Sequence, residues 1–194
     1  SPCEIPSSFA RHRALLSQLI KREILGRYRG SVMGLMWSVL NPLLLLSVYT
    51  FVFSVVFKAR WGGDETLSHA DFALNVFTGL IFFNLFAECF GRSATLILHH
   101  STYVTKVVFP LEILPWMVLG SALFHFLIGL FILLCFKTYL HGSVPFSLMY
   151  LPLLLIPFCL LLMGLMWFLS ALGVYLRDIG QLIGLVTTVL MFLS

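Results

Sequence analysis

Long stretches without an acidic or basic side chain constrain this chain more than any other feature of its sequence. Residues 32–57 and 146–176 contain no Asp, Glu, Lys or Arg. A helix needs roughly 20 mainly apolar residues to cross a lipid bilayer, and both runs exceed that length. Only 10% of the residues are charged, whereas an average soluble domain is about 25% charged. We therefore predict an integral membrane protein rather than a soluble globule.

The apolar runs favour helices over the strands of a membrane barrel. Membrane strands alternate with a period of two, and these runs, rich in Leu, Phe and Met, show no such alternation. A helix surrounded by lipid is apolar on every side, so no helical periodicity is expected. We predict a single all-α membrane domain with an N-terminal amphipathic interface helix. The predicted segments are 7–29 for that helix and 32–57, 72–98, 110–136, 146–176 and 179–194 for five spans.

The positions of the basic residues predict an orientation, because Lys and Arg favour the cytoplasmic side of short loops. With a cytoplasmic N-terminus, nine of the 12 basic residues lie inside and three outside. The inside set is Arg11, Arg13, Lys21, Arg22, Arg27, Arg29, Arg92, Lys106 and Arg177, and the outside set is Lys58, Arg60 and Lys137. The fifth span then leads outward and is apolar to the last residue. We expect a longer protein, with one more span that returns the chain to the cytoplasm.

Cysteine spacing and net charge exclude several other functions. Cys3, Cys89, Cys135 and Cys159 form no CxxC pair, so we expect apolar packing residues, no disulfide and no metal site. The formal charge of +4 comes from the ends of the helices. It is explained by membrane topology and implies no nucleic-acid partner.

The segment before the first span is basic and amphipathic. Apolar residues such as Leu16 and Ile20 share one helical face with Glu23, and most basic residues lie elsewhere. Such a helix is suited to lie in the lipid headgroup layer. A cleavable targeting sequence fits poorly, because Glu23 is acidic and the following apolar run is too long. The residues expected to anchor this helix and its elbow are Lys21, Arg22, Arg27, Tyr28 and Arg29.

Glycine and proline residues occur where the chain is expected to enter the membrane. Gly26, Gly30 and Gly34 recur every fourth residue. They either allow another helix to approach closely or supply the freedom that a bend needs. Asn41 and Pro42 lie inside the first span, where we expect proline to kink the helix. In the fifth span, Gly180 and Gly184 repeat the spacing that allows helices or protomers to approach.

Three stretches carry a resemblance to a known family. The first is LIKREILGRYRGSVMGLMWSVLNPLLLLSVYTFVFSVVF, with Arg-Tyr-Arg-Gly, Asn-Pro and Tyr-Thr-Phe-Val-Phe in that order. The others are YVTKVVFPLEILP at 103–115 and GVYLRDIGQLIGLVTTVLMFLS at 173–194. Together they resemble the membrane subunit of ABC-2-type polysaccharide exporters, which carry O-antigen, capsule or teichoic acid chains.

The resemblance implies an ABC-2-type transmembrane domain of six spans, with re-entrant segments and the sixth span following Ser194. It also implies a homodimer that binds two copies of a cytoplasmic ABC ATPase subunit, membrane lipid and a polyprenyl-linked polysaccharide. The chain has no GxxxxGK[ST] phosphate loop. It is therefore expected to be a transport subunit rather than an enzyme, with no cofactor of its own and with ATP and Mg on the partner subunit.

We expect the connection between the second and third spans to contact the ATPase and to move with it. Pro110 and Pro115 stop helix propagation there, which leaves a short polar segment able to sit in a cleft of the ATPase and transmit its closure. The alternative is an ordinary solvated connector. The predicted coupling residues are His99, His100, Ser101, Thr102, Tyr103, Val104, Thr105 and Lys106. No third ligand lies near the two histidines in sequence, so a metal role is not expected.

Ionisable residues inside or beside the spans are expected to be structural. Glu88 and Arg92 are four residues apart and can pair along one helical face. A substrate contact is the alternative, because intramembrane charges face protein or water. Arg177 and Asp178 are expected to form a local pair before the fifth span. His125 is expected to be a hydrogen-bonded packing residue.

Aromatic rings suit a polysaccharide channel, because sugars present flat apolar faces rimmed with hydroxyls. Tyr49, Phe51 and Phe53 are the candidate channel lining, and lipid contact or packing is the alternative. The predicted function is ATP-driven export of a lipid-linked polysaccharide, most specifically O-antigen, across the bacterial inner membrane. The alternatives are an ABC-2 exporter of another lipid or drug, an integral-membrane polyprenyl-sugar transferase, and an anchor without transport.

Overall fold

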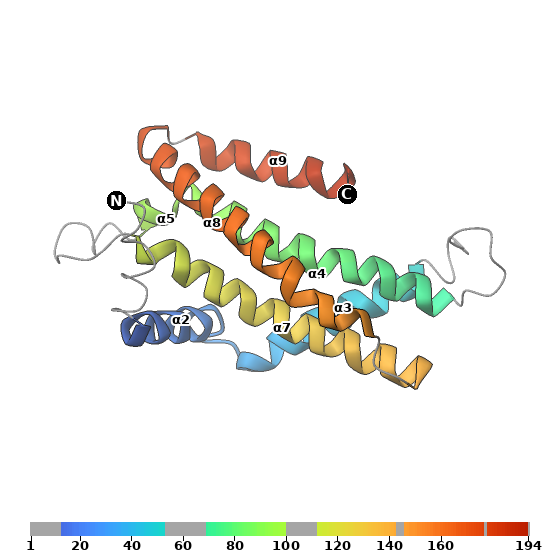
Figure 1. Cartoon of the computed structure of the whole chain (residues 1–194). Coiled ribbons are helices and arrows are strands. Elements are labelled where there is room, and N and C mark those ends of the chain that lie inside the picture. Colours follow the sequence, from blue (N-terminus) through green and yellow to red (C-terminus); the bar gives the residue numbers. More distant parts are fainter. Residues whose placement is uncertain (1–12, 53–68, 100–111, 143–145, 177, 194) are drawn as a thin grey trace. The chain divides into compact units, whose positions relative to one another are not determined.

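The structure, a computed structural model, describes residues 13–52, 69–99, 112–142, 146–176 and 178–193. Every element in these ranges is helical (Figure 1), which confirms the predicted all-α class. The elements are α2 (Arg13–Arg27), η1 (Gly34–Met36), α3 (Trp37–Phe51), α4 (His69–Ser93), α5 (Leu96–His99), α7 (Ile113–His141), η3 (Phe146–Tyr150), α8 (Leu151–Tyr175) and α9 (Ile179–Leu193).

Four helical segments are long and apolar enough to cross a membrane. They are Gly34–Phe51, Ala73–Ser93, Ile113–Leu140 and Leu148–Tyr175, and α9 contributes a shorter apolar helix. Within the predicted span 72–98, α4 ends at Ser93 and a separate short helix, α5, follows; the bounds of the span itself remain a prediction. The predicted interface helix also ends earlier, at Arg27 rather than residue 29. Residues 7–12 and 53–57 of the predicted segments lie outside the described ranges.

The elbow between α2 and α3 is a pair of turns built on glycine. Ser31 N donates to Tyr28 O at 3.2 Å, and Gly34 N donates to Ser31 O at the same distance. Gly30 has φ of 87° and Gly34 has φ of 51°, a backbone region that L-residues with a Cβ rarely adopt. Apart from the adjoining backbone, no heavy atom of the described residues lies within 4 Å of a Cβ placed on Gly26, Gly30 or Gly34. The positive φ values fit the bend, and within the described residues no helix approaches these glycines.

Helix α3 continues through Pro42, and the kink predicted there remains a prediction. Proline lacks the N–H that would bond to the carbonyl of Ser38. One turn earlier, the Ser38 hydroxyl donates to Leu35 O at 2.6 Å. Only 11% of Gly34–Phe51 is buried inside the chain, against 44% of Ile113–Leu140. Most of this first span is therefore open to lipid or to another protein surface.

The described helices contribute to two compact units. Unit 1 comprises Ser1–Arg27, Leu85–Leu123 and Tyr150–Ser194, and unit 2 comprises Tyr28–Asn84 and Phe124–Met149. In unit 2, the first half of α4 packs on the second half of α7. Phe82 and Phe126 meet edge to face with ring centroids 5.1 Å apart, and a Cβ on Gly129 would lie 3.3 Å from Ile81 Cγ1. A small residue in α7 thus admits a branched one from α4.

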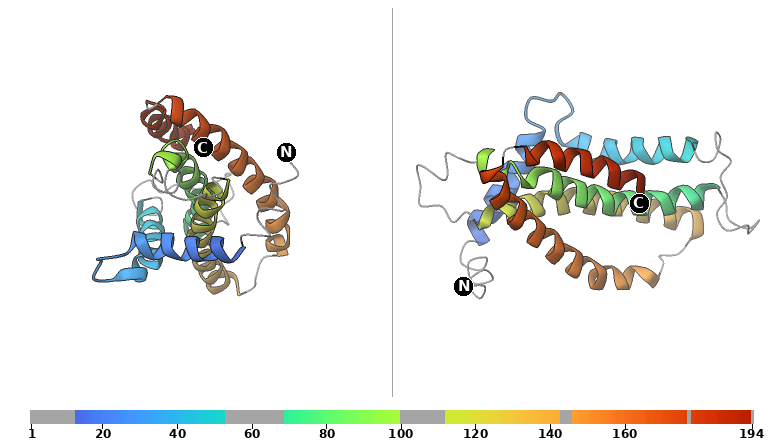
Figure 2. Two further views of the ribbon diagram at one scale, coloured as in Figure 1. Left: turned by 90° about the vertical axis from the view of Figure 1, so that its left-hand side faces the viewer. Right: turned by 90° about the horizontal axis from the view of Figure 1, so that it is seen from above.

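Unit 1 contains the most deeply buried side chains of the described residues. Leu114 and Val118 of α7, Leu162 and Met166 of α8, and Cys89 of α4 are all less than 2% exposed. Trp116 and Trp167 meet edge to face across α7 and α8, with ring centroids 6.4 Å apart. Figure 2 shows α5 beside the last turns of α8, at the turn from which α9 departs. Unit 1 therefore joins the end of α4 to the junction of α8 and α9.

Candidate functional site

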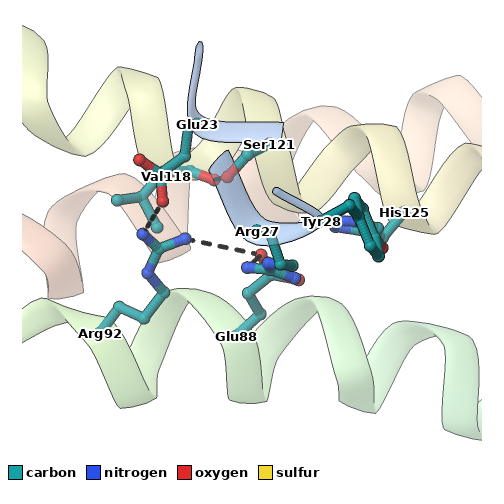
Figure 3. A network of polar contacts seen from close by, with 8 residues as sticks. All are labelled: Glu23, Arg27, Tyr28, Glu88, Arg92, Val118, Ser121 and His125. Atoms are coloured by element: carbon teal, nitrogen blue, oxygen red, sulfur yellow. Dashed lines mark hydrogen bonds and ion pairs between the residues drawn. The ribbon is translucent and has the colours of Figure 1, made fainter. Parts of the chain in front are cut away.

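Four charged side chains of unit 1 form a cluster between α2 and α4 (Figure 3). The charge cluster comprises Glu23 and Arg27 of α2 together with Glu88 and Arg92 of α4. Arg27 Nη2 donates to Glu88 Oε1 at 2.5 Å. Arg92 Nη2 donates to Glu23 Oε1, and Arg92 Nη1 lies 3.8 Å from Glu88 Oε1. Each helix therefore supplies one acid and one base, and the cluster is electrically neutral.

The cluster is only partly open to its surroundings. The side chain of Glu88 is 16% exposed and that of Arg27 is 37% exposed. Attraction between charges grows as water is excluded, whereas removing one partner leaves the other charge poorly solvated. An unmade hydrogen bond of this kind costs on the order of 1–3 kcal/mol. The cluster can therefore hold α2 against α4 more firmly than an ion pair on an open surface.

Apolar contacts extend the same face of α2. Leu16, Ile20, Glu23 and Arg27 follow one another at intervals of four, three and four residues, which places them on one side of a helix. Leu16 is buried. A Cβ on Gly120 of α7 would lie 2.8 Å from Ile20 Cγ1 and closer still to Ile20 Cδ1. Gly120 thus leaves a notch that Ile20 fills, so α2 is held by packing as well as by charge.

The predicted anchors of the interface helix divide into two groups. Lys21, Arg22 and Arg29 are exposed, as a headgroup-facing role requires, and that role remains a prediction. Arg27 instead meets Glu88 within unit 1. In unit 2, Tyr28 Oη and His125 Nε2 are 3.0 Å apart, with their rings edge to face. The hydrogen-bonded role expected of His125 is therefore confirmed.

The predicted coupling residues follow directly after this region. His99 is the last residue of α5, and residues 100–106 lie outside the described ranges. Between α4 and α5, Ala94 and Thr95 form a turn. The Ser93 hydroxyl donates to Phe90 O at 2.6 Å, and such local bonding competes with the helical backbone ladder. Glu88 and Arg92 therefore occupy the last two turns of α4 before the chain leaves for the predicted coupling segment.

The other predicted residues receive less support from the structure. Tyr49 is half-buried and Phe51 is exposed on α3, while Phe53 lies outside the described ranges, so the channel lining remains a prediction. Arg177 also lies outside them, which leaves its pair with Asp178 untested. Asp178 O accepts from Gln181 N at 3.1 Å and from Leu182 N at 3.2 Å. The backbone of Asp178 thus begins α9.

A family comparison agrees with this architecture. The sequence profile of the ABC-2 type transporter family matches residues 14–194. The chain belongs to the ABC-2 type transporter family. The match covers α2 except for its first residue, every described span and α9. Together with the four apolar helices, it identifies a multi-pass inner-membrane protein of a transporter family.

Two similar proteins carry the same name. The chain is 29% identical over 182 residues to the O-antigen export system permease protein RfbA of Myxococcus xanthus, an alignment that covers 93% of the chain and 66% of that protein. It is 27% identical over 174 residues to the protein of the same name from Klebsiella pneumoniae, covering 88% of the chain and 63% of that protein. The chain therefore spans just under two thirds of the length of these curated relatives.

Two features of the site were missed by reasoning from sequence. Glu23 shares a helical face with apolar residues and is the only acid in the basic segment 13–27. That isolated charge was a usable signal for a cation elsewhere in the chain. Nothing in the sequence around Gly120 indicates a contact, because the space that it leaves matters only once Ile20 is known to lie beside it.

Proposed function

We propose that this chain is the membrane subunit of an ATP-driven ABC transporter that exports a lipid-linked O-antigen across the bacterial inner membrane. The observation that carries the proposal is the likeness to two O-antigen export permeases over 93% and 88% of the chain. The long apolar spans support the membrane role. The sequence contains no phosphate-binding loop, which fits an ATPase site on another subunit.

The proposed complex is a dimer of this chain with two copies of a cytoplasmic ABC ATPase, which holds the ATP and Mg. The N-terminus lies in the cytoplasm, as the excess of basic residues before Gly30 indicates. In this orientation α2, the last turns of α4 and α5 all lie at the cytoplasmic side. The coupling segment, residues 99–106, which follows α4 and α5 in the sequence, then meets the ATPase.

The charge cluster makes α2 and the end of α4 a single mechanical element in this proposal. A push on the coupling segment reaches α5 first and then the final turns of α4. Because Glu23 and Arg27 bind Arg92 and Glu88, the interface helix follows the movement instead of remaining with the lipid headgroups. A rigid-body shift of this kind is a common way for a small displacement to reach a distant gate.

A long sugar polymer needs a continuous path rather than a closed pocket of fixed size. Tyr49 and Phe51, with Phe53 beyond the described part of the first span, are proposed to line that path. Tyr49 and Phe51 lie on α3, the least buried of the four spans. Aromatic faces contact sugar rings without tight directional bonds, which allows a polymer to slide.

The test is genetic and biochemical. The full-length gene is deleted in its native host, and O-antigen is measured on the cell surface and on the cytoplasmic face of the inner membrane. Loss from the surface with accumulation of lipid-linked polymer inside, reversed by the wild-type gene, is the expected result. Normal surface O-antigen in the deletion strain, or selective loss of a smaller lipid, would overturn the proposal. Co-purification with an ABC ATPase tests the partner separately.

A further inference from the structure

The turn between α4 and α5 is packed against the junction of α8 and α9 at unusually close range. Gly173 lies in the last turn of α8. A Cβ on this residue would lie 2.8 Å from the Ala94 carbonyl carbon and closer still to the carbonyl oxygen. The obstacle is backbone, which cannot rotate away as a flexible side chain can. Any side chain larger than hydrogen at position 173 would therefore collide with the backbone of Ala94.

Helix α9 also packs against the turn at Ala94 and Thr95. Ala94 is buried with Ile179 and Ile183 of α9, and Phe90, Leu169 and Leu172 pack around them. A Cβ on Gly180 would lie 3.5 Å from Thr95 Cγ2, which is ordinary van der Waals contact. Ala94 and Thr95 are therefore held by α8 through Gly173 and by α9 through its first two turns.

These contacts join parts of the chain that are separated in sequence by α7 and most of α8. The turn at Ala94 and Thr95 follows the second span, whereas Gly173 and Ile179 flank the connection between α8 and α9. Helix α5 lies beside the last turns of α8 in both views of Figure 2. A displacement of α5 therefore meets the α8–α9 junction directly, without passing through the length of α4 or α7.

We propose that Gly173 is a positioning residue that makes the α8–α9 junction move together with α5. This inference rests on the proposed export function and assigns the route by which motion of α5 reaches α9. The close backbone contact at Gly173 transmits a push from the Ala94 turn, and the cluster of Ala94, Ile179 and Ile183 carries it into the first turns of α9. Interfaces packed this tightly shift as one body rather than deforming gradually.

The first experiment compares two glycine substitutions in the same helix. Gly173→Ala adds a methyl group against the Ala94 backbone, whereas Gly164→Ala adds the same group where no heavy atom of the described chain lies within 4 Å. Both variants of the full-length protein are purified with the ATPase, reconstituted, and assayed for complex yield, ATP hydrolysis and O-antigen export. We expect Gly173→Ala to lower export per ATP hydrolysed several-fold at normal hydrolysis, and Gly164→Ala to match wild type. Unchanged export per ATP in Gly173→Ala would overturn the proposal.

The second experiment does not depend on tolerating a bulky residue. Cysteines replacing Thr95 and Gly180 are candidates for a disulfide. Thr95 Cγ2 stands one bond beyond Cβ, where the sulfur of a cysteine would be, and it lies 3.5 Å from a Cβ placed on Gly180, so the two side chains meet as a disulfide requires. If the turn and α9 move together, the oxidised Thr95→Cys/Gly180→Cys protein exports as well as the reduced one. Export that stops on oxidation and returns on reduction would show that they separate. Oxidised wild-type protein is the control for its native cysteines.

Failure of the proposed function gives a different result. A wild-type complex that hydrolyses ATP but exports no O-antigen contradicts the export assignment. The disulfide yield of Thr95→Cys/Gly180→Cys, measured with and without vanadate-trapped nucleotide, still tests the mechanical inference in that case. A constant yield supports the joint movement of α5 and α9, and a yield that falls in the trapped state overturns it.

Discussion

Arg92 of α4 binds Glu23 of α2 across 69 positions of sequence, and the same guanidinium faces Glu88 on its own helix. The contact converts an interface helix, which by composition alone would lie on the membrane surface, into a helix attached to the second span. Arg27 and Glu88 repeat the attachment one turn away. The relationship leads to predictions about both stability and transport.

The charge cluster should show energetic coupling between its helices. Glu23→Gln and Arg92→Gln should each destabilise the protein by on the order of 1–3 kcal/mol, because each leaves a partly buried charge without its partner. The double substitution should cost less than the sum of the two single ones. Thermal unfolding of the purified protein in one detergent measures all three, and Lys21→Gln on the exposed side of α2 is the matched control. Additive effects would mean that the pair contributes no interaction energy.

The notch at Gly120 should control the attachment of α2. Gly120→Leu should displace Ile20, because the new side chain occupies the space of its Cγ1 and Cδ1 atoms. A cysteine at Leu16, which is buried in the native protein, should then react faster with a maleimide. Ile20→Ala should restore slow labelling in the Gly120→Leu background. Gly91→Leu, at an open position of α4, should leave the labelling rate unchanged, and equal rates in all variants would exclude the notch.

Two glycines near the elbow should respond to alanine with opposite signs. Gly26 lies inside α2 with open space around it, so Gly26→Ala should stabilise the protein by up to about 1 kcal/mol through helix propensity. Gly30 has φ of 87°, and Gly30→Ala should cost about 1–2 kcal/mol because alanine avoids the left-handed region. The two Tm values should therefore lie on either side of wild type. A stabilising Gly30→Ala would show that the elbow does not need this turn.

The coupling segment should face the cytoplasm and be dispensable for insertion. A cysteine introduced at Thr102 should react with a membrane-impermeant maleimide in inverted vesicles and remain unlabelled in intact cells, since the proposed orientation puts residues 99–106 inside. Replacing 99–106 with a Gly/Ser segment of equal length should leave membrane insertion and abolish export driven by ATP hydrolysis. Labelling of Thr102→Cys from outside the cell would contradict the orientation and the coupling role together.

The sequence alone determined the class and the approximate spans of this protein. Long apolar runs are stable only where lipid or protein surrounds them, so the sequence of 32–57 and 146–176 predicts membrane helices without reference to any contact. The family resemblance likewise rested on ordered local motifs, and the family match over residues 14–194 agrees with it. The four-residue spacing of Glu88 and Arg92 was also readable, because neighbours on one helix have a known geometry.

Only the tertiary structure showed what those helices do to one another. Glu23 and Arg92, Ile20 and Gly120, and Ala94 and Gly173 meet through long-range packing, and no local spacing predicts which distant residue a helix face will touch. The break after Ser93 was missed for the same reason: residues 94–98 are apolar enough to continue a span, and the turn at Ala94 is held by α8 and α9. The composition of a segment determines whether it lies in lipid or in water. Its position relative to other helices depends on how their side chains pack together.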